Sequence, residues 1–172
     1  MREPDDKPHR HALRRGRVSV PGKAYFITKC ALVPEDPILT KPGCADVVVD
    51  ALLWARNSGW WRVLGFVVMP DHYHAALALG NTKSLSDAMW SIGKYTAARI
   101  NRLLGRTGGL WEEGFYDHLI RDRDDFDEVL KYVHENPVAA GLVESVELWP
   151  YSTANCRYAS DIDWEWLGSS VP

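Results

Sequence analysis

The chain has 172 residues, of which 46% are hydrophobic and 25% charged, and this length and composition suit one domain with a single core. No apolar run approaches the roughly 18 residues of a membrane span, and segment 1–17 is charged throughout, which excludes a secretory signal on pattern. We therefore expect a cytoplasmic protein, and its three cysteines, which form no CxxC pair, predict neither a disulfide framework nor a thiolate zinc site.

Charge is distributed unevenly along the chain. The net charge is −3, but residues 1–23 carry seven Lys or Arg against three Asp or Glu, a balance of +4 that leaves −7 for the rest. We therefore expect a basic arm at 1–22, a folded domain at 23–155 and a C-terminal tail at 156–172. A second basic stretch, 88–111, contains four Lys or Arg and no acid. The acidic overall balance argues against a partner bound through phosphates alone.

Hydrophobic periodicity predicts strands and helices in alternation. In chain order, the pattern predicts a strand at 24–32, a helix at 44–58, strands at 60–69 and 72–80, a helix at 84–104, a strand at 115–121 and a helix at 122–136. Gly59 and Gly105 are the expected stops of the first two helices, and Pro137 is the expected terminator of the third. This β-α-β-β-α-β-α order predicts an α+β fold, a ferredoxin-like antiparallel sheet with helices mainly on one face.

Two histidines lie close to the turn that joins the central strands. His72 and His74 are two residues apart on the strand predicted at 72–80, so their side chains leave the same face of the sheet. Two imidazoles on one face could hold a divalent ion. An isolated pair with this spacing is more often solvated or hydrogen-bonded, and a third ligand would change that balance.

The last predicted helix carries a tyrosine and an asparagine one turn apart. Tyr132 and Asn136 are four residues apart and share a face, although core-edge packing and a helix-end role are the alternatives for these two side chains. His134 lies about 200° around the helix from Tyr132, which predicts that it faces solvent. Tyr95 and Tyr116 are the competing tyrosines, but neither is followed by Asn or Gln four residues later.

Three segments together resemble the REP-associated tyrosine transposases, a branch of the single-tyrosine HUH transposases. They are VVMPDHYHAALAL at 67–79, GKYTAARINRLLGRTGGLWEEGFYDHLIRD at 93–122 and KYVHENPVAAGLVESVELWPYST at 131–153. The resemblance implies a metal-dependent single-stranded DNA endonuclease and strand transferase that acts on hairpin, REP-like DNA through a 5′-phosphotyrosine intermediate. Two departures from the family pattern are the bulky Tyr73 between the histidines and the acidic balance of the chain.

The resemblance also assigns roles to individual residues. It makes Tyr132 the nucleophile and His72, His74 and Asn136 the ligands of a divalent metal, Mg²⁺ or Mn²⁺. It implies a monomer or a homodimer, because related proteins include both. An aromatic and basic stripe within about 60° on the helix at 84–104, with the basic arm and one histidine, supplies the candidate DNA contacts. These contacts are Arg14, Arg15, Arg17, Tyr95, Arg99, Arg102, Arg106 and His118.

Two other functions remain open from the sequence. A domesticated nucleic-acid-binding protein would keep the fold without turnover, and the acidic balance of the chain is its main support. A zinc hydrolase would use His72, His74 and another histidine with a bound water. For the stripe and the arm, a solvated basic face and a disordered tail are the alternatives to DNA contact.

Overall fold

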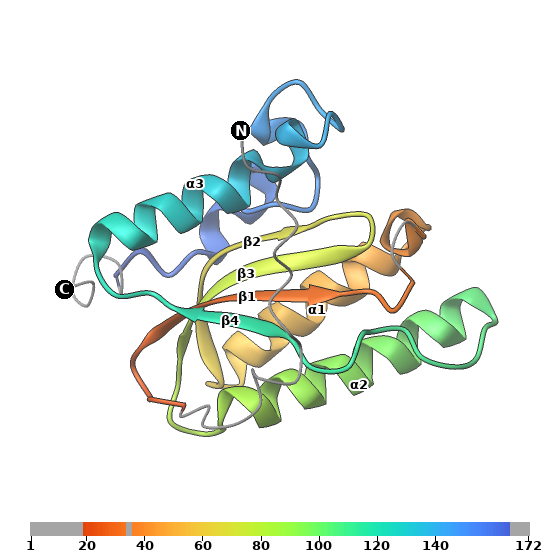
Figure 1. Ribbon diagram of the computed structural model, residues 1–172, viewed down its shortest axis with the longest axis horizontal. Helices are drawn as coiled ribbons and strands as arrows, with labels where there is room; N and C mark the ends of the chain where they lie inside the picture. The colour runs from red at the N-terminus through yellow and green to blue at the C-terminus, as the bar shows by residue number, and fades with distance from the viewer. Residues whose placement is uncertain (1–18, 34–35, 166–172) are drawn as a thin grey trace, which may run out of the picture.

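The computed structural model describes residues 19–33 and 36–165 (Figure 1). Its main elements are β1 (Ala24–Cys30), α1 (Cys44–Asn57), β2 (Trp61–Val68), β3 (His72–Leu79), α2 (Leu85–Leu104), β4 (Tyr116–Leu119) and α3 (Arg123–Ala139). Short 3-10 helices are η2 (Ile38–Thr40), η3 (Val146–Leu148) and η4 (Cys156–Asp161). The predicted order of strands and helices is confirmed. Among the described residues, no helix is long and apolar enough to cross a membrane.

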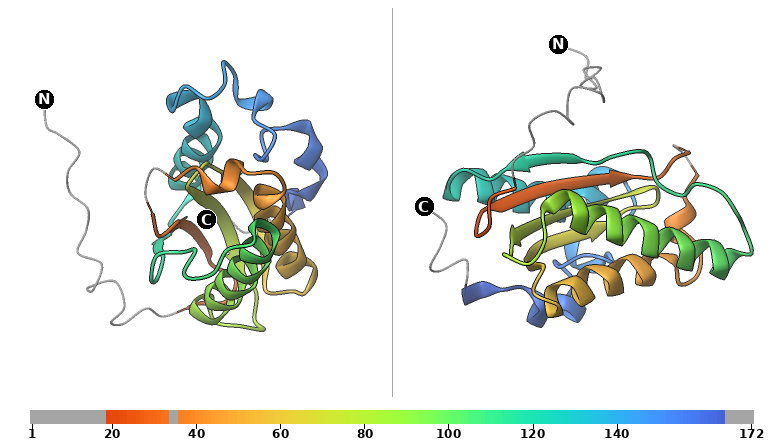
Figure 2. Two further views of the ribbon diagram at one scale, coloured as in Figure 1. Left: turned by 90° about the vertical axis from the view of Figure 1, so that its right-hand side faces the viewer. Right: turned by 90° about the horizontal axis from the view of Figure 1, so that it is seen from below.

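The four strands form one antiparallel sheet with the order β2-β3-β1-β4. Helices α1 and α2 lie side by side on one face of this sheet, and α3 lies on the other (Figure 2). The predicted α+β sheet with helices mainly on one face is therefore confirmed. Beyond α3, the chain returns along the free edge of β2, where the Val68 N–H donates to the Tyr151 carbonyl over 2.8 Å.

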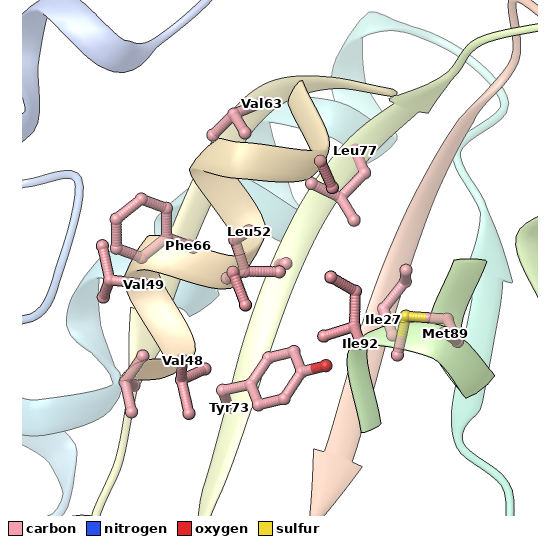
Figure 3. Close-up of a cluster of buried hydrophobic side chains, with 14 of the residues drawn as sticks. Ile27, Val48, Val49, Leu52, Val63, Phe66, Tyr73, Leu77, Met89 and Ile92 are labelled. Atoms are coloured by element: carbon pink, nitrogen blue, oxygen red, sulfur yellow. The ribbon is translucent and has the colours of Figure 1, made fainter. Parts of the chain in front are cut away.

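The larger core lies between the sheet and the pair α1 and α2 (Figure 3). Alternate residues of the strands supply one side, and apolar residues at helical spacing supply the other. Tyr73 belongs to this core: its ring packs edge-on against Trp111 with centroids 5.6 Å apart, and burial raises the pKa of its phenol. Because Tyr73 points into the core, it lies on the opposite face of β3 from the two flanking histidines.

A smaller core holds α3 against the other face of the sheet. Phe126 and Val133 of α3 are fully buried there, and Leu130 packs beside them. Gly65 on β2 leaves the space that Leu130 needs, because a Cβ at Gly65 would lie 2.5 Å from Leu130 Cδ1. The pairing of β2 with β3 shifts register at Val63 and Gly65, so the strand is irregular where α3 crosses it.

Helix α2 has a cap at each end, including the expected Gly105, whereas the end of α3 differs from the expectation. Ser84 accepts the Asp87 N–H at the start of α2, and Gly105 ends that helix with φ 63°. The expectation that α3 stops before Pro137 is wrong, because the helix continues to Ala139 with Pro137 buried inside it. Proline removes one N–H donor, but the Ala140 N–H still donates to the Asn136 carbonyl and continues the hydrogen bonding.

Residues 156–165 fall in the segment expected to be a tail, and they pack against α1 and β2. The Tyr158 ring is buried and contacts the Phe66 ring edge-on at 5.2 Å. Arg56 of α1 forms an ion pair with Asp161 over 2.8 Å. These contacts complete the side of the molecule that lies furthest from β4.

Candidate active site

The two histidines of β3 converge on one point. His72 and His74 lie on the face of the sheet that α3 covers, and their Nε2 atoms are 3.1 Å apart. Two nitrogens that bind one metal ion through bonds of about 2.1 Å have a similar separation. The His74 residue is only 4% exposed, whereas His72 is partly open to solvent. The same-face arrangement predicted from their spacing is present.

The outer nitrogen of each ring has a partner. Asp71 Oδ1 lies 2.6 Å from His72 Nδ1, and Thr28 Oγ1 lies 2.8 Å from His74 Nδ1. In the tautomer with the proton on Nδ1, each ring donates outward to this oxygen and keeps the Nε2 lone pair free. Thr28 reaches His74 because the two residues are directly opposite in the β1–β3 register.

The environment of the His74 ring keeps it uncharged. Burial, assisted by the nearby His72, lowers the pKa of His74 to about 3. The ring is therefore neutral near pH 7. A neutral imidazole is the form that coordinates metal ions, so the environment of His74 suits a ligand.

Tyr132 comes to this pair from α3. Its ring meets the His74 ring edge-on with centroids 5.2 Å apart, and it meets Phe26 in the same way at 5.9 Å. Phe26 in turn stacks on His74 at 5.3 Å. The Tyr132 residue is 52% exposed, so its ring is fixed on one side and open to solvent on the other. The structure thus unites the tyrosine and the histidine pair that the sequence singled out.

Asn136 lies one turn beyond Tyr132 on α3 and is half-buried. Its side-chain amide forms no hydrogen bond with any residue in 19–33 or 36–165. Two imidazoles and an amide oxygen would make a mixed donor set that suits Mg²⁺ or Mn²⁺. No group of three His, Cys, Asp or Glu suited to a metal occurs within the described residues, so these residues do not assemble the third-histidine zinc site.

The candidate DNA contacts are spread over the molecule. Tyr95, Arg99 and Arg102 are exposed on α2, on the opposite face of the sheet from the histidines. Arg106 follows the end of α2 and donates to the Gly109 carbonyl over 3.4 Å. The arm residues Arg14, Arg15 and Arg17 lie outside the described residues.

His118 ties the edge strand to the start of α3. Its Nε2 lies 2.9 Å from both carboxylate oxygens of Asp125, in the first turn of the helix. The Asp125 carboxylate also accepts the Arg121 N–H over 3.0 Å. The His118 ring therefore has a partner within the protein. Its contact with DNA stays a prediction.

The prediction that His134 faces solvent is wrong. Its Nε2 lies 2.9 Å from Thr153 Oγ1, and burial lowers the pKa of the ring. Thr153 also accepts the Phe66 N–H of β2 over 2.9 Å. Helical spacing could not predict this environment, because the segment that covers His134 follows the helix and returns along β2.

Two further residues near the histidines were missed as parts of the site. Thr28 contacts His74 directly, and Tyr116 of β4 is opposite Thr28, so His74, Thr28 and Tyr116 form one row across the sheet. Tyr116 is partly exposed at the open edge. Only the strand register reveals these neighbours, and the sequence does not specify the register.

Comparison with known proteins settles the family. The family described as "Transposase IS200 like" matches residues 36–136, more than half of the chain. The chain belongs to the IS200-like transposases. The prediction of a transposase is thereby confirmed at the level of the family. Similar proteins named as REP-associated tyrosine transposases confirm the narrower resemblance.

Individual relatives agree with this assignment. One relative is a Haemophilus influenzae protein that is named as a REP-associated tyrosine transposase. It is 42% identical over 123 residues, which span 60% of this chain and 66% of the relative. The REP-associated tyrosine transposase of Escherichia coli K12 is 27% identical over 86% of this chain and 88% of its own length. A solved REP-associated tyrosine transposase bound to a REP hairpin superposes with a TM-score of 0.67 at 25% identity, covering 80% of this chain and 79% of that one.

Proposed function

We propose that this transposase is a metal-dependent endonuclease and strand transferase for single-stranded, hairpin-bearing DNA, with Tyr132 as its nucleophile. The observation that carries the proposal is the contact of the Tyr132 ring with His74, whose Nε2 faces that of His72. The solved relative bound to a REP hairpin supports a DNA substrate of the same kind. A REP-like hairpin is therefore the expected target.

A divalent cation, Mg²⁺ or Mn²⁺, would be held by His72, His74 and Asn136. When bound, it would neutralise negative charge on a phosphate oxygen. The remaining residues prepare this site. Asp71 and Thr28 orient the two rings, and burial keeps His74 neutral. A phosphodiester repels nucleophiles because it is an anion, so lowering its charge is the first requirement of the reaction.

The Tyr132 hydroxyl is the attacking group in this proposal. Its oxygen forms a bond to phosphorus while the bond to the 3′ oxygen breaks, which leaves a 5′-phosphotyrosine and a free 3′-hydroxyl. The phenol gives up its proton as it attacks, and the 3′ oxygen gains one. Solvent reaches the half-exposed ring and can carry the proton away. Attack by a 3′-hydroxyl on the phosphotyrosine then rejoins DNA and frees the tyrosine.

One chain supplies every proposed group. Tyr132 contacts His74 of its own chain, so a monomer suffices for a single cut. A homodimer is needed only if two DNA ends are cut at once. The α2 stripe of Tyr95, Arg99 and Arg102 adds phosphate and base contacts beyond the reaction centre.

The test is covalent capture of DNA. A labelled hairpin oligonucleotide with single-stranded flanks is incubated with the protein and Mn²⁺, and the adduct is read on a denaturing gel. We expect Tyr132→Phe to abolish the adduct and chelation of the metal to do the same. Tyr116→Phe is the stringent control, because this tyrosine shares the sheet face with His74 and should leave the adduct in place.

Two outcomes would overturn the assignment. An undiminished adduct in Tyr132→Phe would exclude this residue as the nucleophile. Hairpin binding by the unaltered protein without an adduct under any metal condition would favour a silent DNA-binding protein, the alternative that the acidic balance of the chain supports.

A further inference from the structure

Three rings from three different elements meet beside the histidine pair. Phe26 of β1 stacks on His74 of β3, with ring centroids 5.3 Å apart and ring planes 25° apart. Tyr132 of α3 meets Phe26 almost at a right angle, 85°, with centroids 5.9 Å apart. The same tyrosine meets His74 at 64° and 5.2 Å. We call this group the ring triangle; it consists of Phe26, His74 and Tyr132.

Two members of the ring triangle are held by the sheet itself. Phe26 is two residues before Thr28 on β1, so both side chains leave the same face of the sheet. Thr28 Oγ1 lies 2.8 Å from His74 Nδ1, whereas Phe26 covers the face of the same imidazole. Phe26 is half-buried and packs against the buried residues of the smaller core. Strand β1 therefore contacts His74 at two points, the ring edge and the ring face.

The neighbours of Phe26 across the sheet are small on one side and polar on the other. In the strand register, Phe26 is opposite Ala76 of β3, and Ala76 is opposite Gly65 of β2. On its other side, Phe26 is opposite His118 of β4. Of these four residues, only Phe26 has a large apolar side chain. Within this row, Phe26 is therefore the residue that offers Tyr132 an apolar ring to pack on.

The Tyr132 ring depends on the other two members for its orientation. Its hydroxyl forms no hydrogen bond with any residue in the described ranges 19–33 and 36–165. The residue is 52% exposed, so one side of the ring is open to solvent. A tyrosine ring reorients about two side-chain torsions. The contacts with Phe26 and His74 restrict these torsions, and loss of Phe26 would remove one of the two.

We propose that Phe26 is a positioning residue for Tyr132 and sets the angle at which the phenol meets His74 and the phosphate beside it. This inference rests on the proposed function for the reaction itself. Attack on phosphorus requires the nucleophile within a narrow range of positions, and a displacement of about 1 Å can slow a reaction about 100-fold. Phe26 needs no contact with DNA in this role. Its loss should therefore slow the chemical step and leave DNA binding intact.

The first measurement separates the chemical step from DNA binding. Single-turnover adduct formation on a labelled hairpin with single-stranded flanks is followed at saturating Mn²⁺ over a range of protein concentrations. The unaltered protein is compared with Phe26→Leu, because leucine stays apolar but offers no flat ring. We expect the rate at saturating protein to fall at least about tenfold, because the phenol is no longer aligned. The half-saturating protein concentration should stay within about twofold.

The second measurement observes the Tyr132 ring without DNA. Protein that carries fluorotyrosine in place of tyrosine is studied by fluorine NMR, and the Tyr132 resonance is the one that is missing from Tyr132→Phe. Because this ring packs against two other rings, their ring currents shift its resonance. We expect the resonance to move in Phe26→Leu. The resonances of Tyr73 and Tyr158, which lie in the larger core, should stay in place.

A matched control is Phe115→Leu. Phe115 is also half-buried, but it packs against the larger core on the other face of the sheet. Its replacement should leave both the saturating rate and the Tyr132 resonance unchanged. Urea unfolding checks that each variant is folded. Phe26→Met, whose flexible side chain adapts to irregular space, takes the place of Phe26→Leu if the leucine variant is unfolded.

Three results would overturn the proposal. They are an unchanged saturating rate in the Phe26 variant, a loss confined to the half-saturating concentration, which would make Phe26 a DNA contact, and an unmoved Tyr132 resonance. A missing adduct in the unaltered protein would instead refute the proposed function. The fluorine spectrum needs neither DNA nor metal, so it would still decide whether Phe26 fixes the orientation of the Tyr132 ring.

Discussion

At the scale of single residues, the histidine pair depends on two oxygens that are not expected ligands. Thr28 and Asp71 each hold an Nδ1 atom, at 2.8 and 2.6 Å, and so direct both Nε2 atoms toward one point. Partners of this kind fix the tautomer and the angle of a ligating imidazole, and their loss commonly weakens metal binding about 10- to 100-fold. The threonine is the cleaner test because valine matches its shape.

Thr28→Val should therefore weaken Mn²⁺ binding by about tenfold or more, since the Nδ1–H of His74 loses its acceptor and the ring is no longer held. Isothermal titration of the DNA-free protein with Mn²⁺ measures this directly. The matched control is Thr40→Val, whose hydroxyl bonds only the Pro37 carbonyl in the described structure and should leave Mn²⁺ affinity unchanged. Equal affinity in Thr28→Val and the unaltered protein would show that Thr28 does not position His74.

The sequence predicts part of this site and omits the rest for a physical reason. The common face of His72 and His74 follows from the two-residue period of a strand. The approach of Tyr132 follows only from the family resemblance, because 58 positions separate it from His74 and periodicity carries no information over that distance. Thr28 depends on the register between two strands, which local sequence does not determine.

At the scale of elements, the position of α3 decides where Tyr132 lies. Leu130 fits over Gly65 of β2, His134 contacts Thr153 of the returning segment, and His118 contacts Asp125 in the first turn. These contacts are spaced along the helix and lie on both sides of it. Any change that pushes α3 away from the sheet should therefore move the phenol relative to the histidines.

Gly65→Ala should be such a change. The added methyl would lie 2.5 Å from Leu130 Cδ1, so we expect the free energy of unfolding to fall by about 1–3 kcal/mol and adduct formation to slow. Leu130→Ala in the same chain should relieve part of this clash. Urea unfolding of the single and double variants should then show a favourable coupling free energy between the two positions. Gly93→Ala is the control: its Cβ meets nothing closer than 3.9 Å inside α2, and alanine there should be neutral or stabilising by up to about 1 kcal/mol. A Gly65→Ala protein of unchanged stability would contradict this account of how α3 packs on β2.

Element order was predictable because each type of element has a distinct hydrophobic period and explicit end signals. Gly105 ends α2 as expected, and the helix begins within a residue of the predicted start at 84. The end of α3 was not predictable, because burial of Pro137 and the packing of the following segment outweigh the local cost of a proline. His134 was misjudged for a related reason, since its partner Thr153 arrives only when the chain folds back along β2.

At the scale of the whole molecule, the sheet separates two surfaces. The sheet face covered by α3 carries the histidine pair, which Tyr132 of α3 contacts, and on the other side of the sheet α2 carries the exposed residues of the predicted basic stripe. A DNA strand that engages both surfaces must pass an edge or an end of the sheet. Charge is distributed unevenly among the elements: the chain has a net charge of −3, yet residues 88–111 carry four Lys or Arg and no acid.

The central claim is that one chain holds the complete reaction centre, and mixing two inactive variants tests it most directly. Tyr132→Phe keeps the histidines and His72→Ala keeps the tyrosine, so the pair is mixed with hairpin DNA and Mn²⁺ beside the unaltered protein. The account predicts an adduct with the unaltered protein and none above background in the mixture, because each Tyr132 serves the His74 it contacts in its own chain. An adduct on the His72→Ala chain in the mixture would show that the tyrosine acts on the histidines of another copy, and would contradict the account.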